Sequence, residues 1–211
     1  KTRHMVQRYA QMLNICPQNP YMWLTDFEKA DIYMKGIKNY IVIGPGATWF
    51  PKKWPDTSYT ELAIKLLLTK QALFPDAIVV LIGSPNEASS GTYISDHLPK
   101  DRCLNLIGLP ELLTIASIIK GAKLYIGNDN GLMHMAAACQ VPTVGLFGPG
   151  KPDFYRPWGH HCTFVKSDTE HMTDLKVETV YLAIEAFIQI DDSNPDTDLL
   201  KSLSRTLALI A

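Results

Sequence analysis

Apolar residues fall into short runs from residue 40 onward, and these runs alternate with segments in which apolar residues recur at helical spacing. The runs are of strand length and predict strands at 40–46, 77–83, 103–108, 122–127, 143–148 and 162–166. The intervening segments predict helices at 60–74, 86–97 and 112–119, after residue 130, and at 174–189. This alternation, with several strands apolar throughout, is typical of a parallel sheet covered by helices on both faces.

Helical spacing also predicts which side chains of three helices are buried, because residues three and four positions apart share a face. The expected buried faces are Leu112, Ile115, Ala116 and Ile119 in one helix, Leu132, Met135, Ala136 and Cys139 in the next, and Val177, Val180, Ile184 and Phe187 in the last.

The two ends of the chain differ from this alternating core. Residues 1–14 predict a helix, and the segment 16–33 is expected to be irregular. Asn194 and Pro195 are suited to begin a terminal helix whose apolar stripe consists of Leu199, Leu203 and Leu207. Because such stripes need a covering surface, we expect both terminal helices to dock on something outside this chain. The expected division is 1–39, 40–190 and 191–211.

The composition is that of a soluble globular protein, with 46% hydrophobic and 19% charged residues among 211. A formal net charge of -1 gives no general attraction for nucleic acid or for an anionic membrane, so any phosphate recognition has to be local. The four cysteines lack the spacing of a zinc site and are expected to be free buried thiols. No signal-like segment opens the chain, which favours a cytoplasmic location.

The junction IGNDNGLMHMAAACQVPTVGLFGP, residues 126–149, carries the strongest chemical signal. Asn128, Asp129 and Asn130 follow a strand and have side chains that cap helices. Gly131 lets a ligand approach the first turn of a helix, where free N–H groups favour a phosphate. His134 shares a helix face with Asn130 and is expected to point toward that ligand. The alternatives are a core histidine and an Asp129 that only caps the helix.

Two further clusters follow predicted strands. In GPGATWFPKKWP, residues 44–55, Gly44 and Gly46 permit a turn near a ligand, and Lys52 and Lys53 offer cations to phosphate oxygens. In GSPNE, residues 83–87, Glu87 offers a carboxylate to a ribose diol. Solvated lysines and a helix-starting acid are the simpler alternatives. Neither cluster is a Walker A loop or a G-x-G-x-x-G fingerprint. The residues alone therefore indicate a phosphate-bearing nucleotide ligand.

Taken in order, GATWFPKKWP, GSPNE and the junction sequence resemble the bacterial ADP-heptose:lipopolysaccharide heptosyltransferases, glycosyltransferase family 9, over most of residues 40–190. The resemblance implies an α/β fold with a Rossmann-like parallel sheet and helices on both faces, the C-terminal half of a GT-B fold. It also implies an inverting transfer of heptose to the lipopolysaccharide core at the inner face of the inner membrane. No cofactor and no metal are implied.

Residue by residue, the resemblance assigns donor binding to six positions. Lys52 binds donor phosphate, Glu87 the adenosine ribose, and Asp129, Asn130, Gly131 and His134 the diphosphate and the heptose. Secondary candidates are Gly46, Ala47, Lys53 and Asn128. Asn130 stands where the family commonly has threonine or serine. The general base of the family belongs to an N-terminal domain that this sequence lacks, so this chain alone is expected to bind without turnover.

Two other functions stay open at the level of sequence. One is a GT-B transferase that uses a different nucleotide sugar, and the other is a nucleotide-sugar binding module without catalysis. The partners expected for the main reading are ADP-heptose, the lipopolysaccharide core acceptor and the missing N-terminal domain, with no nucleic acid.

Overall fold

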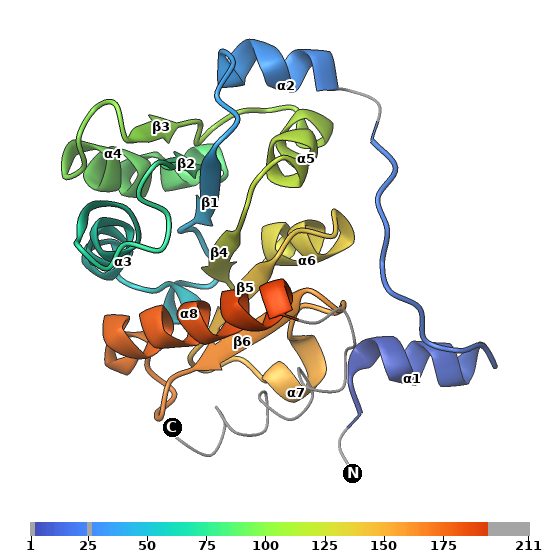
Figure 1. Ribbon diagram of the computed structural model, residues 1–211. Helices are drawn as coiled ribbons and strands as arrows, with labels where there is room; N and C mark the ends of the chain where they lie inside the picture. Colours follow the sequence, from blue (N-terminus) through green and yellow to red (C-terminus); the bar gives the residue numbers. More distant parts are fainter. Residues whose placement is uncertain (1–2, 25–26, 194–211) are drawn as a thin grey trace.

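The chain forms one parallel sheet with helices on both faces, as Figure 1 shows for the computed structural model, which describes residues 3–24 and 27–193. The six strands are β1 (Tyr40–Gly44), β2 (Ile78–Leu81), β3 (Cys103–Asn105), β4 (Tyr125–Asn128), β5 (Thr143–Phe147) and β6 (Cys162–Lys166). Their order is β3-β2-β1-β4-β5-β6, and every neighbouring pair is parallel. The expected fold class is confirmed.

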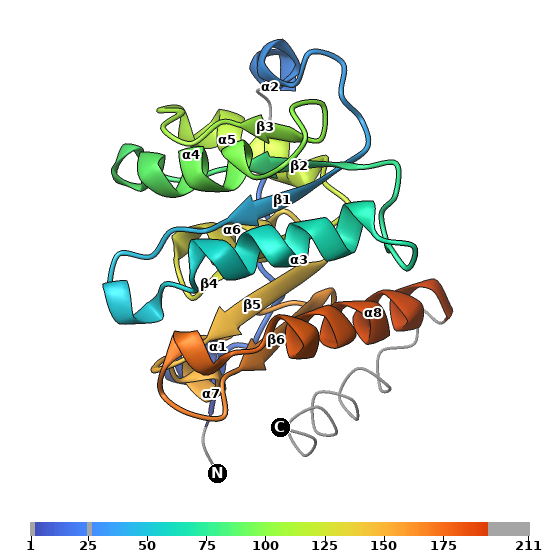
Figure 2. The ribbon, with the colours of Figure 1, turned by 90° about the vertical axis from the view of Figure 1, so that its left-hand side faces the viewer.

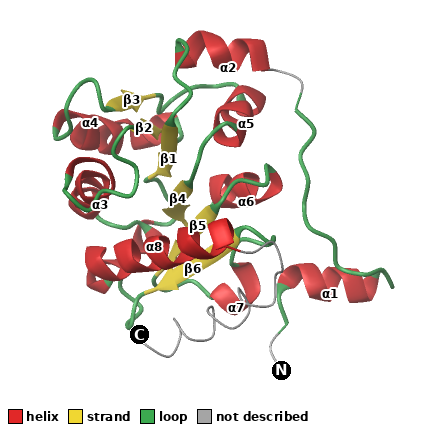
Figure 3. Cartoon of the chain, viewed as in Figure 1, coloured by secondary structure: helices red, strands yellow, loops and turns green. Residues whose placement is uncertain are grey.

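The helices divide between the two faces of the sheet. One face carries α3 (Asp56–Leu68), α4 (Ala88–Asp96) and α8 (Val177–Ser193), and the other carries α2 (Phe27–Met34), α5 (Leu112–Lys120) and α6 (Gly131–Ala138). The remaining helices are α1 (Met5–Met12), α7 (Pro152–Tyr155) and the short 3-10 helices η1 (Phe50–Lys52), η2 (Pro85–Glu87) and η3 (Met172–Asp174). Figure 3 separates helices, strands and loops by colour.

The strands divide their side chains between two apolar cores. In β1, Ile41 and Ile43 face α3 and α8, while Val42 faces the layer that contains α5 and α6. All three are fully buried. A strand with both faces buried has a continuous run of apolar residues, and this is why the sequence predicted β1 clearly.

Three expectations about helices need correction. The segment 16–33, expected to be irregular, contains most of α2, because Ala30 and Met34 lie one turn apart and bury their side chains against the α5 layer. Helix α3 ends at Leu68 instead of residue 74, since the backbone of Thr69 is extended. Leu112 of α5 is exposed, because it begins the helix beyond the edge of the core.

The buried face of α6 differs in part from the expected one. Met133, Ala136 and Ala137 are buried, whereas Leu132 and Met135 are only partly buried. By contrast, the four residues expected to be buried in α8, Val177, Val180, Ile184 and Phe187, are all buried. The cysteines are free as expected, but only Cys139 is buried, and Cys16 is exposed. The terminal helix expected at 194–211 lies outside the described residues.

Helix α1 is attached to the domain by its first turn. His4, which precedes the helix, is buried, and its ring stacks on Trp158 at 4.6 Å between centroids. Its Nδ1 accepts a hydrogen bond from the Val6 amide at 3.2 Å, so the proton lies on Nε2, which donates to the Arg156 carbonyl at 2.9 Å. Farther along, Tyr9 and Met12 are exposed.

Candidate functional site

The loops that carry the predicted site residues meet at the carboxyl edge of the sheet. β1 is hydrogen-bonded to β2 on one side and to β4 on the other, so the chain reverses its direction of travel across the sheet between β1 and β4. Ligands of open parallel sheets bind in the crevice at such a reversal. Figure 2 shows the loops after β1 and β5, with their short helices, at this same edge.

Asn128 ties the loop after β1 to the end of β4. Its side chain is fully buried. Its Oδ1 accepts hydrogen bonds from the Trp54 amide at 3.1 Å and the Tyr59 hydroxyl at 3.0 Å. Its Nδ2 donates to the carbonyls of Pro45 at 2.9 Å and Gly46 at 3.0 Å. Asn128 was a secondary candidate for donor contact, but every polar group of its amide already has a protein partner, so it positions the loop instead.

Asn130 is the cap of α6 and a second tie to the β1 loop. Its Oδ1 accepts from the Met133 amide at 3.2 Å, and its Nδ2 donates to the Gly46 carbonyl at 2.8 Å. The bond to Gly46 uses one of the two N–H groups of Nδ2, so the second N–H is left to donate to a phosphate. The cap is Asn130, so Asp129 is not the helix cap that the sequence allowed as an alternative.

Gly131 opens α6 on the exposed side of the site. A Cβ at this position would have no protein atom within 4 Å. The first turn of a helix has backbone N–H groups without partners inside the helix, and they attract anions. The space beside Gly131 is therefore open, which the predicted anion site requires.

Lys52 and Asp129 form the central ion pair of the site. Lys52 Nζ lies 2.6 Å from Asp129 Oδ2, and the exposed fraction of the side chain is 28% for the lysine and 7% for the aspartate. The short helix η1 brings Lys52 over the end of β4. The solvated-surface alternative is therefore wrong for Lys52.

Lys53 has a different partner from its neighbour. Its Nζ lies 2.9 Å from Asp56 Oδ2 in the first turn of α3. The acid suits the positive end of the helix dipole, and Lys53 pairs locally with its carboxylate. Lys53 was a secondary candidate, and in this conformation it supports α3. Ala47, another secondary candidate, is half-buried in the loop after β1.

Glu87 lies against the glycines that end β1 and β2. Its Oε2 accepts a hydrogen bond from the Ser84 amide at 2.6 Å, so the helix-starting role is present. The same carboxyl group occupies the space that a Cβ of Gly46 or Gly83 would need. The half-buried Glu87 therefore lies between the two loops, and its carboxylate stands beside Gly46 at the carboxyl edge.

His134 lies on the solvent side of α6 and is exposed, which excludes the core-histidine alternative. Although the ring reaches water, desolvation by the surrounding protein lowers its pKa. Asp129 acts in the opposite direction, and Lys52 lowers the pKa further. The ring is therefore neutral at pH 7, and it can donate or accept a hydrogen bond beside the ion pair.

Gly150 is a site residue that sequence reasoning did not select. It lies in the loop after β5, and a Cβ there would come within 3.0 Å of Asp129 Oδ2 and 2.9 Å of Phe147 Cδ1. A larger residue would press on the carboxylate of the ion pair. The signal lay in the sequence GPG at 148–150, because Gly150 directly follows the junction of residues 126–149.

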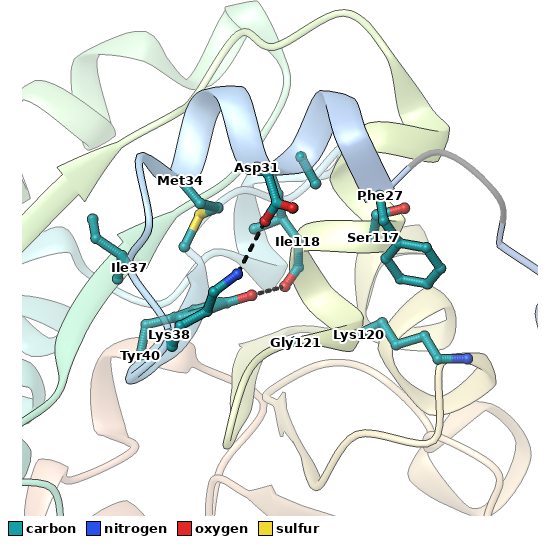
Figure 4. A pocket seen from close by; sticks show the side chains of 11 residues that line it. Phe27, Asp31, Met34, Ile37, Lys38, Tyr40, Ser117, Ile118, Lys120 and Gly121 are labelled. Carbon is teal, nitrogen blue, oxygen red and sulfur yellow. Dashed lines mark hydrogen bonds and ion pairs between the residues drawn. The ribbon is translucent and has the colours of Figure 1, made fainter.

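A hollow of about 190 Å³ lies elsewhere, between α2 and the end of α5 (Figure 4). Its lining includes Phe27, Met34 and Ile118, and an exposed ion pair joins Lys38 Nζ to Asp31 Oδ1 at 3.1 Å. Tyr40, at the amino end of β1, also lines it, so this hollow and the Lys52–Asp129 pair lie at opposite edges of the sheet. None of the predicted site residues lines it.

Within residues 3–24 and 27–193, no three His, Cys, Asp or Glu side chains are grouped so that they could hold a metal ion. No helix of these ranges is both long and apolar enough to cross a membrane.

The strand order defines a Rossmann-like α/β domain, with the predicted site residues at the carboxyl edge of its sheet. The sequence profile of glycosyltransferase family 9 (heptosyltransferase) matches residues 1–184, and the chain belongs to this family.

Curated relatives with the same enzyme name agree with this membership. The chain is 32% identical over 179 residues to lipopolysaccharide heptosyltransferase 2 of Salmonella typhimurium (strain LT2), covering 81% of this chain and 50% of the relative. It is 37% identical over 126 residues to lipopolysaccharide heptosyltransferase 2 of Escherichia coli (strain K12), covering 58% of this chain and 34% of the relative. The match thus spans about half the length of the Salmonella relative and about a third of the length of the E. coli relative.

A solved structure shows the same arrangement. The structure of E. coli ADP-heptose lps heptosyltransferase II superposes with a TM-score of 0.73 at 28% identity, and the match covers 89% of this chain and 59% of that one. A glycosyltransferase family 9 structure from Veillonella parvula matches with a TM-score of 0.78, and at 19% identity it supports the fold alone.

Proposed function

We propose that this chain is the donor-binding half of an inverting heptosyltransferase that transfers heptose from ADP-heptose to the lipopolysaccharide core. One observation carries the proposal: Lys52 pairs with Asp129 at the carboxyl edge of the sheet, and the open first turn of α6 begins two residues after that aspartate. Such a pairing suits the two charged groups of a diphosphate. The relatives that carry heptosyltransferase names support the choice of sugar.

The proposed chemistry is a direct displacement. The acceptor hydroxyl attacks the anomeric carbon while the glycosidic bond to the diphosphate breaks, and the configuration inverts. Charge develops on the leaving phosphate, where Lys52 and the N–H groups of α6 stabilise it. The proton of the acceptor passes to a general base in the other half of a GT-B enzyme, at the inner face of the inner membrane.

Each remaining donor contact is assigned by position. Glu87 is proposed to accept hydrogen bonds from the ribose diol, because its carboxylate stands at the edge beside Gly46. His134 is proposed to contact the diphosphate or the heptose from the exposed side of α6. Asn130 and Asn128 support these contacts by holding the β1 loop in place.

Calorimetric titration of the chain with ADP, and with UDP as the control, tests the proposal. We expect selective binding of ADP and a loss of about tenfold to a hundredfold in affinity for Lys52→Ala, because a hydrogen bond to a charged group contributes about 1.5–3 kcal/mol. A preference for UDP would move the chain to another nucleotide sugar. An unchanged affinity in Lys52→Ala would refute the role of the lysine.

A further inference from the structure

Asp129 stands in an unfavourable place for an acid if a diphosphate binds beside it. Its side chain is 93% inaccessible, since only 7% is exposed, and burial strengthens the repulsion between like charges. Its backbone amide donates to the Leu146 carbonyl at 3.2 Å, and its carboxylate lies against Gly150. These contacts hold the carboxylate at the edge of the sheet, so it cannot easily turn away from an entering anion.

Lys52 is the movable member of the ion pair. It ends the short helix η1, and the exposed Phe50 and Trp49 lie in the same loop. A lysine has four rotatable carbons and a point charge that can serve two anions at once. An entering diphosphate therefore has to share or take over an ammonium that Asp129 already holds at 2.6 Å.

The number of charges on the ligand changes during the proposed reaction. The diphosphate of a nucleotide sugar is a diester with two negative charges. When the glycosidic bond breaks, the electron pair stays on the phosphate oxygen, and the released diphosphate carries a third charge above the second pKa of a phosphate monoester, about 6. A fixed carboxylate repels the product more than the donor.

We propose that Asp129 is a positioning residue that holds Lys52 in the empty site and selects against the product diphosphate, which promotes its release. The inference rests on the proposed function, because it needs a diphosphate ligand at α6. Asp129 then has two opposing effects: it places the cation that binds the donor, and it lowers the affinity for the ligand that remains after transfer.

The test compares two ligands and two carboxylate-to-amide variants at pH 8 and fixed salt. The ligands are ADP and ADP-ribose, a diphosphate diester that lacks the third charge. For Asp129→Asn we expect ADP affinity to rise at least about threefold, with a smaller rise for ADP-ribose. The control Asp31→Asn breaks the exposed Lys38–Asp31 pair beside the other hollow, and it should change neither affinity.

The outcomes separate the inference from the proposed function. The unmodified chain gives the reference ratio of ADP affinity to ADP-ribose affinity. If that chain binds both ligands and the ratio in Asp129→Asn is equal to the reference or lower, the inference is overturned and the proposed function stands. If the unmodified chain binds neither ligand, both are overturned. Asp129→Ser is the second variant if the amide prevents folding, and the same change in ratio is expected from it. Thermal unfolding of each variant identifies those that remain folded.

Discussion

Two asparagines two positions apart have different tasks. Asn128 is fully buried and makes four hydrogen bonds, whereas Asn130 is half-buried and makes two. Sequence reasoning placed both among residues able to cap a helix. The bond pattern separates them, because only Asn130 accepts a hydrogen bond from inside α6.

Asn128→Ala should therefore be the more damaging of the two alanine substitutions. It removes the partner of the Pro45 carbonyl, the Trp54 amide and the Tyr59 hydroxyl, while the Gly46 carbonyl keeps its bond from Asn130, and buried groups without partners cost about 1–3 kcal/mol each. We expect a loss of about 3 kcal/mol in the free energy of unfolding, measured with urea. Asn130→Ala should lose about 1 kcal/mol, the usual cost of an N-cap. Equal losses would contradict the distinction.

At the scale of elements, the first turn of α6 and the β1 loop differ in whether their glycines have space for a side chain. A Cβ at Gly131 meets open space, while a Cβ at Gly46 would overlap the Glu87 carboxyl group. No protein atom thus requires the first glycine, and the proposed function assigns it to the approach of a ligand. The second is required by packing.

Gly131→Ala should separate binding from stability. We expect the free energy of unfolding to rise by up to about 1 kcal/mol, because alanine is the better helix former. Affinity for ADP should fall by about tenfold, or ~1.4 kcal/mol, since the methyl group enters the space of the ligand. The comparison is Gly46→Ala, which should lower stability as well as affinity. An alanine at 131 that binds ADP normally would show that no ligand approaches this turn.

Helix α1 should respond to acid through His4. Burial lowers the pKa of His4, with Arg156 and His134 adding to the effect, while the bond to the Arg156 carbonyl raises it. The unfolded chain, with a histidine pKa near 6.5, then binds a proton more readily than the folded chain. Stability should fall as the pH drops below about 6.5. His4→Asn keeps a capping side chain without this charge, so its unfolding free energy should change less between pH 7.5 and 5.5 in urea titrations.

The sequence predicted the sheet better than the edges of its helices. Runs such as β1 were clear because both faces are buried. The buried face of α6 was predicted only in part, because Ala136 and Cys139 are buried as expected, whereas Leu132 and Met135 are only partly buried. The short spacing of Lys52 and Lys53 could not show that one pairs with Asp129 across 77 positions and the other with Asp56 three positions away. Partners that are distant in sequence depend on tertiary structure.

At the scale of the whole molecule, ligand binding should be linked to unfolding. If the site belongs to this half, ADP at about one hundred times its dissociation constant should stabilise the folded chain by about 2.7 kcal/mol. We expect the thermal midpoint to rise with ADP, and to rise by less in the Lys52→Ala variant at the same concentration, because a tenfold to hundredfold weaker affinity leaves only about 0.4–1.4 kcal/mol of stabilisation. A midpoint that ADP does not move in the unmodified chain would contradict the proposed site.

The hydrogen bond from Asn128 to the Pro45 carbonyl in the β1 loop joins residues that are 83 positions apart in the chain. During synthesis, β1 and its loop leave the ribosome well before β4 does. The edge of β1 that pairs with β4 in the folded sheet therefore has no partner strand during that interval. An unpaired apolar strand edge is open to association with other chains. Mutations that slow the arrival of β4 should therefore appear as aggregation during synthesis in the cell, even where the purified protein is stable.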